Sequence, residues 1–298
     1  MPGFSADHNG TSQQIMYADN VDFSGADNNT VQERVIADGQ LLIGASTSPK
    51  IRVNTLTAGS GITVTNGAGT ITIASFAPNS IVQIFDDFVG SGVTALTSGQ
   101  QSWKTSSGWT QDTSISDKDH PGVFGSPINT AGSQHMFLGL PSGGAILKQY
   151  FLGGGVLNVN FVINFATLST PTNTYTFRIG IGDTENADQA NGCYLEYTHN
   201  VNSGNWVYKT AANSVRTAVN SSVAVSTGWH NVGLTVNANG TSVSFTVNGV
   251  SLGAPIITNL PILGTTAFLD IVRSAGTIPA LAIRFDLFYL QQILTNAR

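Results

Sequence analysis

The carboxylates of this chain limit the chemistry that it could perform. Hydrolysis of a glycosidic bond requires two carboxyl groups on either side of the bond, one acting as the acid and one as nucleophile or base. The chain has only three glutamates, Glu33, Glu185 and Glu196, and no carboxylate stands two residues from Glu196 on its expected strand. We therefore expect a protein that is not an enzyme. A polysaccharide-degrading hydrolase remains the alternative in that class.

A short acidic loop is the one place where the sequence suggests a cation. It contains Asp183, Glu185 and Asp188 and is followed by Asn191. Carboxylate and amide oxygens are the ligands that Ca²⁺ prefers. Because the glycine-ordered pattern of known calcium loops is missing, a solvated acidic turn between two strands is the other interpretation.

Aromatic residues are the candidates for contact with a sugar, because a flat ring can cover the apolar face of a pyranose while amides bind its hydroxyls. We expect Trp206 to be exposed in a turn with Asn202 and Asn205, with Tyr208 nearby. Trp229 is expected in the core. The other aromatic candidates are Trp103, Trp109, Tyr194 and Tyr197.

The histidines and the cysteine offer no recognisable catalytic pattern. His120 lies in a polar loop that ends in Pro121-Gly122, which favours a surface turn. No partner for His120 stands at a defined spacing, and the remaining histidines are isolated in the same way. Cys193, the only cysteine, excludes an intramolecular disulfide and is expected to be buried as a small apolar residue.

The elements that must position these residues are predicted to be antiparallel strands. Apolar and polar residues alternate from Leu157 to Phe165 and from Tyr175 to Ile181. One apolar and one polar face per strand is typical of sheets that pack face to face. We predict an all-β domain over residues 81–298. Its further expected strands are 134–140, 145–151, 192–199, 205–210, 229–237, 241–248, 265–273 and 280–291.

Two Asn-Gly dipeptides predict tight hairpin turns, at Asn239-Gly240 and Asn248-Gly249, because both residue types tolerate positive φ. The whole block Gly228–Gly253 resembles concanavalin-A-like jelly rolls of the laminin-G and lectin type, with a Trp-led strand, a turn, a strand ending in Asn-Gly and a short strand. In this resemblance Ile84–Phe88 is the opening edge and Ile283–Tyr289 the closing strand.

An N-terminal hairpin is expected to associate with copies of itself. Ile62 and Val64 alternate with polar residues, as do Ile71 and Ile73, around Asn66-Gly67. Two such short strands carry too few apolar side chains to be stable alone in water. Residues 37–80, the hairpin and a hinge, are therefore predicted to be an oligomerisation module.

The same segment resembles a known virion module. Asp38-Gly-Gln-Leu-Leu-Ile-Gly44, followed by Gly61-Ile-Thr-Val-Thr-Asn-Gly-Ala-Gly-Thr-Ile-Thr-Ile73, is similar to a segment of bacteriophage tail-fibre-like and other virion-associated proteins. The resemblance implies a homotrimeric virion appendage with an outward-facing distal domain. It also implies that residues 1–36 form an extended arm bound to other virion proteins, anchored by apolar residues such as Phe4, Tyr17 and Phe23.

Composition restricts the partners and the location. Charged residues make up only 10% of the chain and the net charge is −5, with no basic cluster, so nucleic acid is not an expected partner. The N-terminus has no signal-peptide pattern and no apolar run is long enough to insert into a membrane. We expect synthesis in the host cytoplasm and assembly into a virion, where the jelly roll binds host-surface glycans. The alternative is head decoration without a receptor.

Overall fold

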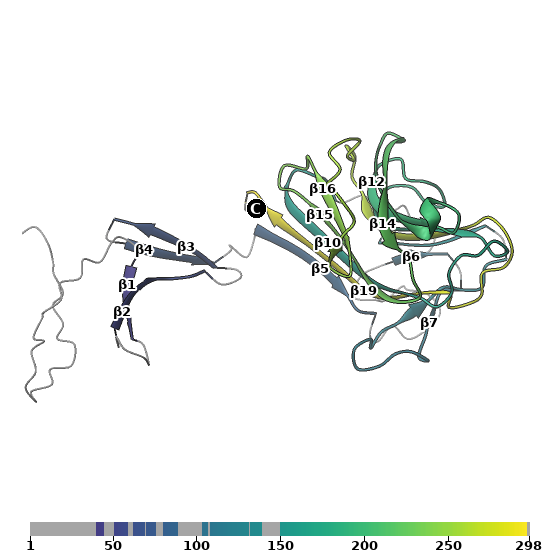
Figure 1. Cartoon of the computed structure of the whole chain (residues 1–298), viewed down its shortest axis with the longest axis horizontal. Coiled ribbons are helices and arrows are strands. Elements are labelled where there is room, and N and C mark those ends of the chain that lie inside the picture. Colours follow the sequence, from purple (N-terminus) through teal and green to yellow (C-terminus); the bar gives the residue numbers. More distant parts are fainter. Residues whose placement is uncertain are drawn as a thin grey trace, which may run out of the picture. The chain divides into compact units, whose positions relative to one another are not determined.

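The computed structural model describes residues 40–44, 51–58, 62–68, 70–75, 80–88, 103–106, 108–130, 132–138 and 150–296 (Figure 1). The chain divides into two units, Met1–Ala77 and Pro78–Arg298. Regular structure in the described residues is almost entirely antiparallel strand, which confirms the expected all-β class. None of the described helical residues forms a segment with the length and hydropathy of a membrane span.

The N-terminal unit contains two hairpins. Strand β1 (Gln40–Gly44) pairs with β2 (Ile51–Thr55), and β3 (Ile62–Gly67) pairs with β4 (Thr70–Ser75). The β3–β4 register places Val64 opposite Ile73, so the hairpin predicted around Asn66-Gly67 is confirmed. The arm of residues 1–36, with the proposed anchors Phe4, Tyr17 and Phe23, lies outside the described residues.

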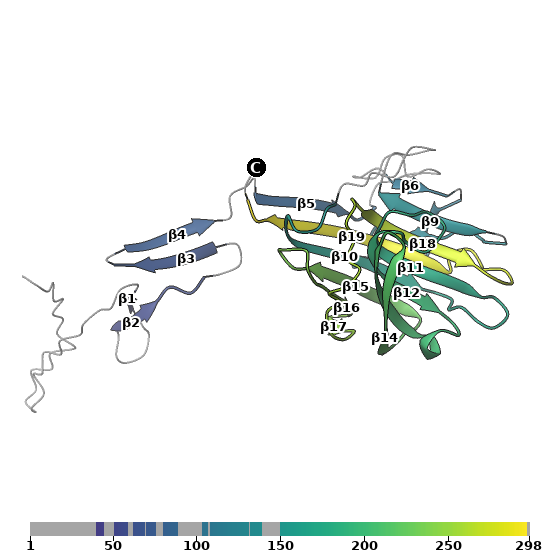
Figure 2. The same cartoon turned by 90° about the horizontal axis from the view of Figure 1, so that it is seen from above.

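The second unit is a sandwich of two antiparallel sheets (Figure 2). One sheet, called here the β10 sheet, runs in the order β17-β16-β15-β10-β19-β8-β7, with β5 also paired to β19. Its strands are β5 (Ile81–Asp86), β7 (Thr110–Gln111), β8 (Phe124–Gly125), β10 (Gly155–Phe165), β15 (Gly228–Val236), β16 (Val243–Val247), β17 (Val250–Ser251) and β19 (Ile283–Leu294).

The other sheet, called the β11 sheet, runs in the order β14-β13-β12-β11-β18-β9-β6. A 3-10 turn at Asn202–Gly204 precedes β13. The strands are β6 (Trp103–Thr105), β9 (Ser133–Leu138), β11 (Tyr175–Gly182), β12 (Gly192–Thr198), β13 (Asn205–Ala212), β14 (Val215–Ala224) and β18 (Thr266–Arg273).

The core lies between the two sheets and is rich in aromatic rings. Phe165 of β10 packs edge-on against Phe177 of β11, with ring centroids 5.0 Å apart. Cys193 is fully buried, as expected, and burial raises the pKa of its thiol. Because inward residues alternate with outward ones along each strand, every second side chain is left for the two outer faces.

Most predicted strands are confirmed, with shifted ends. The turn at Asn248-Gly249 has the expected positive φ at both residues. Strand β14 was not predicted, and residues 139–149, which contain most of the expected strand 145–151, lie outside the described residues. Of the expected strand 145–151, the structure shows an isolated β-bridge from Tyr150 to Thr265.

Candidate functional site

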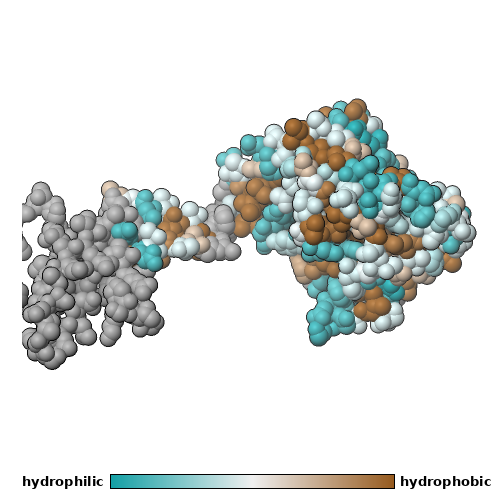
Figure 3. All heavy atoms as spheres, in the orientation of Figure 1, coloured by the Kyte–Doolittle hydropathy of each residue, from teal (hydrophilic) through white to brown (hydrophobic). Residues whose placement is uncertain are grey.

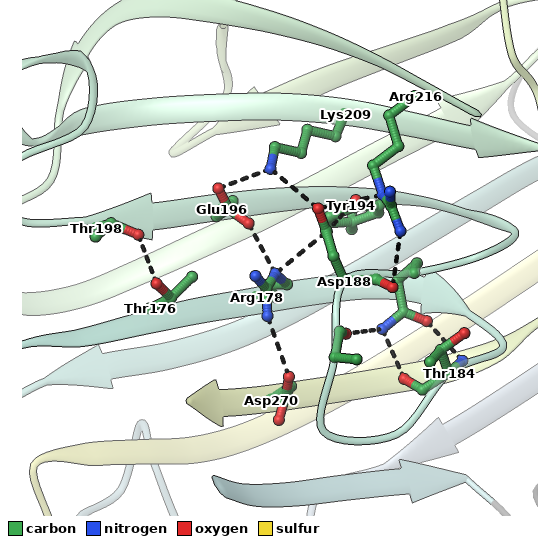
Figure 4. A network of polar contacts seen from close by, with 12 residues as sticks. Thr176, Arg178, Thr184, Asp188, Tyr194, Glu196, Thr198, Lys209, Arg216 and Asp270 are labelled. Carbon is green, nitrogen blue, oxygen red and sulfur yellow. Dashed lines mark hydrogen bonds and ion pairs between the residues drawn. The ribbon is translucent and has the colours of Figure 1, made fainter. Parts of the chain in front are cut away.

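A charged network covers part of the outer face of the β11 sheet (Figure 4). Arg178 of β11 stands at its centre, and the register places Glu196 of β12 on one side and Asp270 of β18 on the other. Arg178 Nε donates to Glu196 Oε2 at 2.7 Å, and Lys209 Nζ of β13 donates to Glu196 Oε1 at 2.7 Å. Both oxygens of Glu196 are therefore bound to cations.

Asp188 enters this network from the loop between β11 and β12. Its carboxylate lies 3.1 Å from Arg216 Nε and 3.6 Å from Lys209 Nζ, and it accepts a hydrogen bond from Tyr194 Oη. Burial alone would raise the pKa of Asp188, but the hydrogen bond from Tyr194 and the three nearby cations, Arg178 included, lower it below its usual value. Asp188 is thus held ionised above the sheet.

The acidic loop does not form the calcium site that the sequence suggested. Asp183 accepts hydrogen bonds from Asn191 N at 2.8 Å and from Asn191 Nδ2 at 3.0 Å, whereas Glu185 pairs with Lys104 Nζ at 2.6 Å. Asp188 is directed to the cations of the network. No group of three or more His, Cys, Asp or Glu in the described residues could hold a metal ion. The sequence reasoning missed the basic side chains, which come from other strands.

Asp270 is the least satisfied member of the network. It is fully buried, its Oδ2 lies 3.5 Å from Arg178 Nη1, and its Oδ1 has no hydrogen-bond partner among the described residues. Burial raises the pKa of Asp270 to about 7, and the attraction of Arg178 only partly opposes this. The next residue in register, His135, has its pKa lowered by burial. These buried groups are not placed to reach a substrate.

Trp206 is not the exposed platform that was expected. Its side chain is 0% exposed and its ring packs 5.9 Å from that of Phe165. Trp206 lies on β13 in phase with Tyr208, two residues later, and both side chains belong to the core between the sheets. The alternation along β13 could therefore have indicated the core position of Trp206.

The residues grouped with Trp206 are also structural. Asn202 Nδ2 donates to the carbonyl oxygens of Trp206 and Ser221, at 3.1 and 2.8 Å. Asn205 begins β13, and Tyr208 is buried against Phe245. The remaining aromatic candidates are buried as well: Trp103, Trp109, Tyr194 and Tyr197.

Trp229 is the tryptophan that the structure leaves partly exposed, although it was expected in the core. It lies on the outer face of the β10 sheet, opposite Asn164 of β10. The ring of His120 stacks on the indole, with centroids 3.7 Å apart and an angle of 11° between the planes. We call Trp229, His120 and the carboxylate that binds His120, Asp286, the Trp229 site.

His120 is held in place from two sides, by partners of which the sequence spacing gave no sign. Its Nδ1 lies 2.7 Å from Asp286 Oδ2, and its backbone N donates to Asp117 Oδ1 at 2.8 Å. Asp286 stands at a register shift in β19, where a bulge turns its side chain toward the loop. When neutral His120 donates from Nδ1, its Nε2 is left as an acceptor. Burial raises the pKa of Asp286 and the contact with His120 opposes the rise.

The loop that carries His120 is fastened to the sheet through Asp112. This buried carboxylate accepts hydrogen bonds from Arg284 Nε at 2.6 Å and from Ser114 N at 2.9 Å. Burial raises the pKa of Asp112, but the hydrogen bonds from Ser114 and Arg284 outweigh it and hold the pKa below its usual value. The Trp229 site is therefore preorganised by ionic contacts beneath it.

A signal for the orientation of Trp229 was present in the sequence. Val232, Leu234 and Val236 alternate with smaller or polar residues and face the core. That period places residues 229, 231, 233 and 235 together on the outer face. The partner of His120 could not be found in this way, because Asp286 is far away in the sequence.

The comparisons with known proteins agree with this architecture. The family described as SO2946-like, C-terminal domain, matches residues 119–286, which is more than half of the chain. No curated protein matches the chain. The crystal structure of SO2946, a protein of unknown function from Shewanella oneidensis MR-1, is 18% identical with a TM-score of 0.53 and covers 76% of this chain and 91% of that one.

Two other similar structures are less close. Peanut lectin is 13% identical, with a TM-score of 0.45, over 73% of this chain and 99% of the lectin. A botulinum neurotoxin type C structure, described as dependent on two ganglioside molecules for cell entry, is 9% identical with a TM-score of 0.44, over 72% of this chain and 48% of its own. The expected fold class, an antiparallel jelly-roll sandwich, is confirmed by the two packed sheets of the second unit.

Proposed function

The chain belongs to the SO2946-like C-terminal domain family, and from this premise we propose that its jelly roll is a carbohydrate-binding module of a virion appendage. The module attaches the particle to glycans on the host surface and performs no catalysis. The observation that carries the proposal is the Trp229 site, a partly exposed tryptophan stacked on a histidine that a buried aspartate orients.

The Trp229 site has the features that sugar binding requires. A partly exposed indole provides apolar surface for a pyranose ring. Nε2 of His120 has no hydrogen-bond partner among the described residues and can accept a hydrogen bond from a sugar hydroxyl. Because Asp286 and Asp117 already fix the histidine, little conformational entropy is lost when the sugar binds.

The absence of catalysis is supported by the two buried carboxylates of the charged network. A glycosidase needs one protonated and one ionised carboxyl group that both reach the scissile bond. Glu196 uses both oxygens for Arg178 and Lys209, and Asp270 is fully buried. Neither group is placed to donate a proton to a substrate or to attack one.

The N-terminal hairpins support the proposed assembly. On the β3–β4 hairpin Ile62 is 39% exposed and Ile73 is 60% exposed. Apolar side chains of this kind are commonly covered by another copy of the chain. We propose that residues 37–80 form a homotrimer and that residues 1–36 bind other virion proteins. The resemblance of residues 37–74 to a phage module supports this assignment.

A glycan array and an adhesion assay on host cells test the proposal with the full chain. Wild-type protein should bind a defined set of glycans and adhere to cells that display them. Trp229→Ala should lose both activities and keep its melting temperature within a few degrees, since Trp229 is at the surface. Phe151→Ala, which removes another exposed aromatic ring, is the matched control and should bind normally. Blank results for the wild type would favour a decoration protein without a receptor.

A further inference from the structure

The loop between β11 and β12, residues 183–191, folds back across the outer face of the β11 sheet (Figure 4). Asn186 Oδ1 of this loop lies 2.6 Å from His135 Nδ1 of β9. Asp188 Oδ2 of the same loop lies 3.1 Å from Arg216 Nε of β14, the strand at one edge of the sheet. The loop therefore spans the sheet from β9 to β14, and we call residues 183–191 the strap.

The strap covers a group of aromatic rings that point away from the core. Phe137, Tyr194 and Phe268 alternate with core residues along their strands, yet each is 0% exposed. The rings of Phe137 and Phe268 stack with centroids 5.5 Å apart. Gln189 of the strap is also fully buried, and a Cβ atom at Gly182 would meet both the Gln189 amide and the Phe268 ring. The strap thus lies on the rings and keeps water from them.

An acidic and a basic side chain lie side by side beneath the strap. Asp270 of β18 stands opposite His135 of β9 on one side and opposite Arg178 of β11 on the other. Asn186 of the strap binds His135. Asp188 of the strap lies 3.4 Å from Arg178 Nε. The strap therefore passes over Asp270, which is 0% exposed and whose Oδ1 has no hydrogen-bond partner in the described structure.

Burial under the strap disfavours the charged form of both groups. It raises the pKa of Asp270 to about 7, against the attraction of Arg178. It lowers the pKa of His135, against the hydrogen bond to Asn186. The charged side chains on the elements packed around the two groups are Arg178, Glu196 and Asp188 near Asp270, and Glu185 and Lys104 near His135.

We propose that the strap is a cover that opens without unfolding of the jelly roll, and that its opening is coupled in opposite directions to the charges of Asp270 and His135. Opening admits water to both groups, so the open state favours ionised Asp270 and protonated His135. The contribution of Asp270 to closure is fully present below pH 3.8 and is lost as the pH rises through about 7. The contribution of His135 is fully present above pH 6.5 and is lost as the pH falls below that value.

Opening of the strap would change the character of this sheet face. It uncovers Phe137, Tyr194 and Phe268 together and removes the carboxylate of Asp188 from Arg178. Apolar residues on the visible face of the jelly roll form separate groups (Figure 3). Three neighbouring rings beside a released guanidinium group are a different kind of surface, and the strap decides when it is exposed. This inference does not depend on the proposed glycan binding.

Hydrogen exchange of the full chain, resolved by mass spectrometry at pH 4.5, 6.0 and 7.5, tests the proposal. The reporters are peptides that cover the strap, in which the amides of Asp183 and Thr184 both donate to Gln189 Oε1 at 2.8 Å. These bonds are shielded from water only while Gln189 is buried. Peptides from β10 report on unfolding of the whole domain. Each observed rate is divided by the intrinsic exchange rate at the same pH, which gives the opening equilibrium.

Two variants separate the two groups. His135→Gln keeps a donor for Asn186 but cannot be protonated, and Asp270→Asn cannot be ionised. The matched controls are Asp119→Asn, at an exposed carboxylate, and His199→Gln, at a histidine outside the strap contacts, and both should follow the wild type. Thermal melting of each variant checks that it is folded.

The two variants should respond to pH with opposite signs. In His135→Gln the opening equilibrium should rise by up to about 200-fold between pH 4.5 and pH 7.5, the change that follows from a pKa of about 7 in the closed state and 3.8 in the open state. In Asp270→Asn it should fall over the same range, and in the wild type it should change less than in His135→Gln. A change of the same sign in both variants refutes the coupling. Strap peptides that exchange only as fast as those of β10 refute the separate opening.

Discussion

Replacing Asp270 with asparagine should remove a pH dependence that the charged network gives to the stability of the jelly roll. The pKa of Asp270 is raised to about 7 from an ordinary value of 3.8, mainly because the residue is buried. Between these two values the folded protein binds more protons than the unfolded chain. The contribution of Asp270 to stability is therefore fully present below pH 3.8 and is lost as the pH rises through about 7.

The size of this pH dependence follows from the shift in the pKa of Asp270. Each pKa unit corresponds to about 1.36 kcal/mol, so between pH 4.5 and pH 7.5 Asp270 should lower the free energy of unfolding by about 3 kcal/mol. For a domain of this size the difference corresponds to about 6–12 °C in melting temperature. His135, whose pKa is lowered by burial, acts in the opposite direction below about pH 6.5, and Asp286 acts in the same direction as Asp270.

Comparison of two proteins at two pH values isolates the contribution of Asp270. Urea unfolding of the wild type and of Asp270→Asn at pH 4.5 and pH 7.5 cancels the contributions of His135 and Asp286. The stability of the variant relative to the wild type should rise by about 3 kcal/mol at the higher pH. Asp119→Asn, at an exposed carboxylate paired with Lys118, is the control and should follow the wild type. If the free energy of unfolding changes by the same amount between the two pH values in the wild type and in Asp270→Asn, the reasoning is refuted.

Three further predictions concern packing and assembly. Trp206→Ala should destabilise the jelly roll by about 3–5 kcal/mol, because it removes a fully buried side chain and leaves a cavity. Urea unfolding at neutral pH measures this loss, and a value below about 1 kcal/mol would contradict the burial of Trp206. Gly180→Ala should lower the melting temperature, since its Cβ would lie 2.3 Å from the carbonyl oxygen of Cys193, and an unchanged melting curve would contradict the close approach. Native mass measurement of the full chain should give a trimer that weakens when residues 1–76 are deleted, and a stable monomer at micromolar concentration would contradict the assembly.

The sequence predicted the strands whose inner faces are strongly apolar. Strand β10, with Leu157, Val159, Phe161 and Ile163 facing the core, is the clearest case. Strand β14 was missed because it is an edge strand, and most of its side chains are not buried. Its alternation of small and polar residues, Val215-Arg-Thr-Ala-Val-Asn-Ser-Ser-Val-Ala224, carries a weak apolar signal.

The candidate site was less predictable because long-range contacts and bulges create it. The phase of β15 could have placed Trp229 on the outer face, but only the fold brings His120 to Asp286. A register shift in β19 aims Asp286 at the loop. The calcium hypothesis failed for a similar reason, since the cations that bind the acidic loop come from distant strands.

A crystal structure of the full chain with a glycan selected on the array tests the central claim most directly. The account predicts a sugar ring against Trp229 with a hydroxyl within hydrogen-bond distance of His120 Nε2. A glycan bound instead on the β11 sheet, against Arg178 and Glu196, would contradict the account.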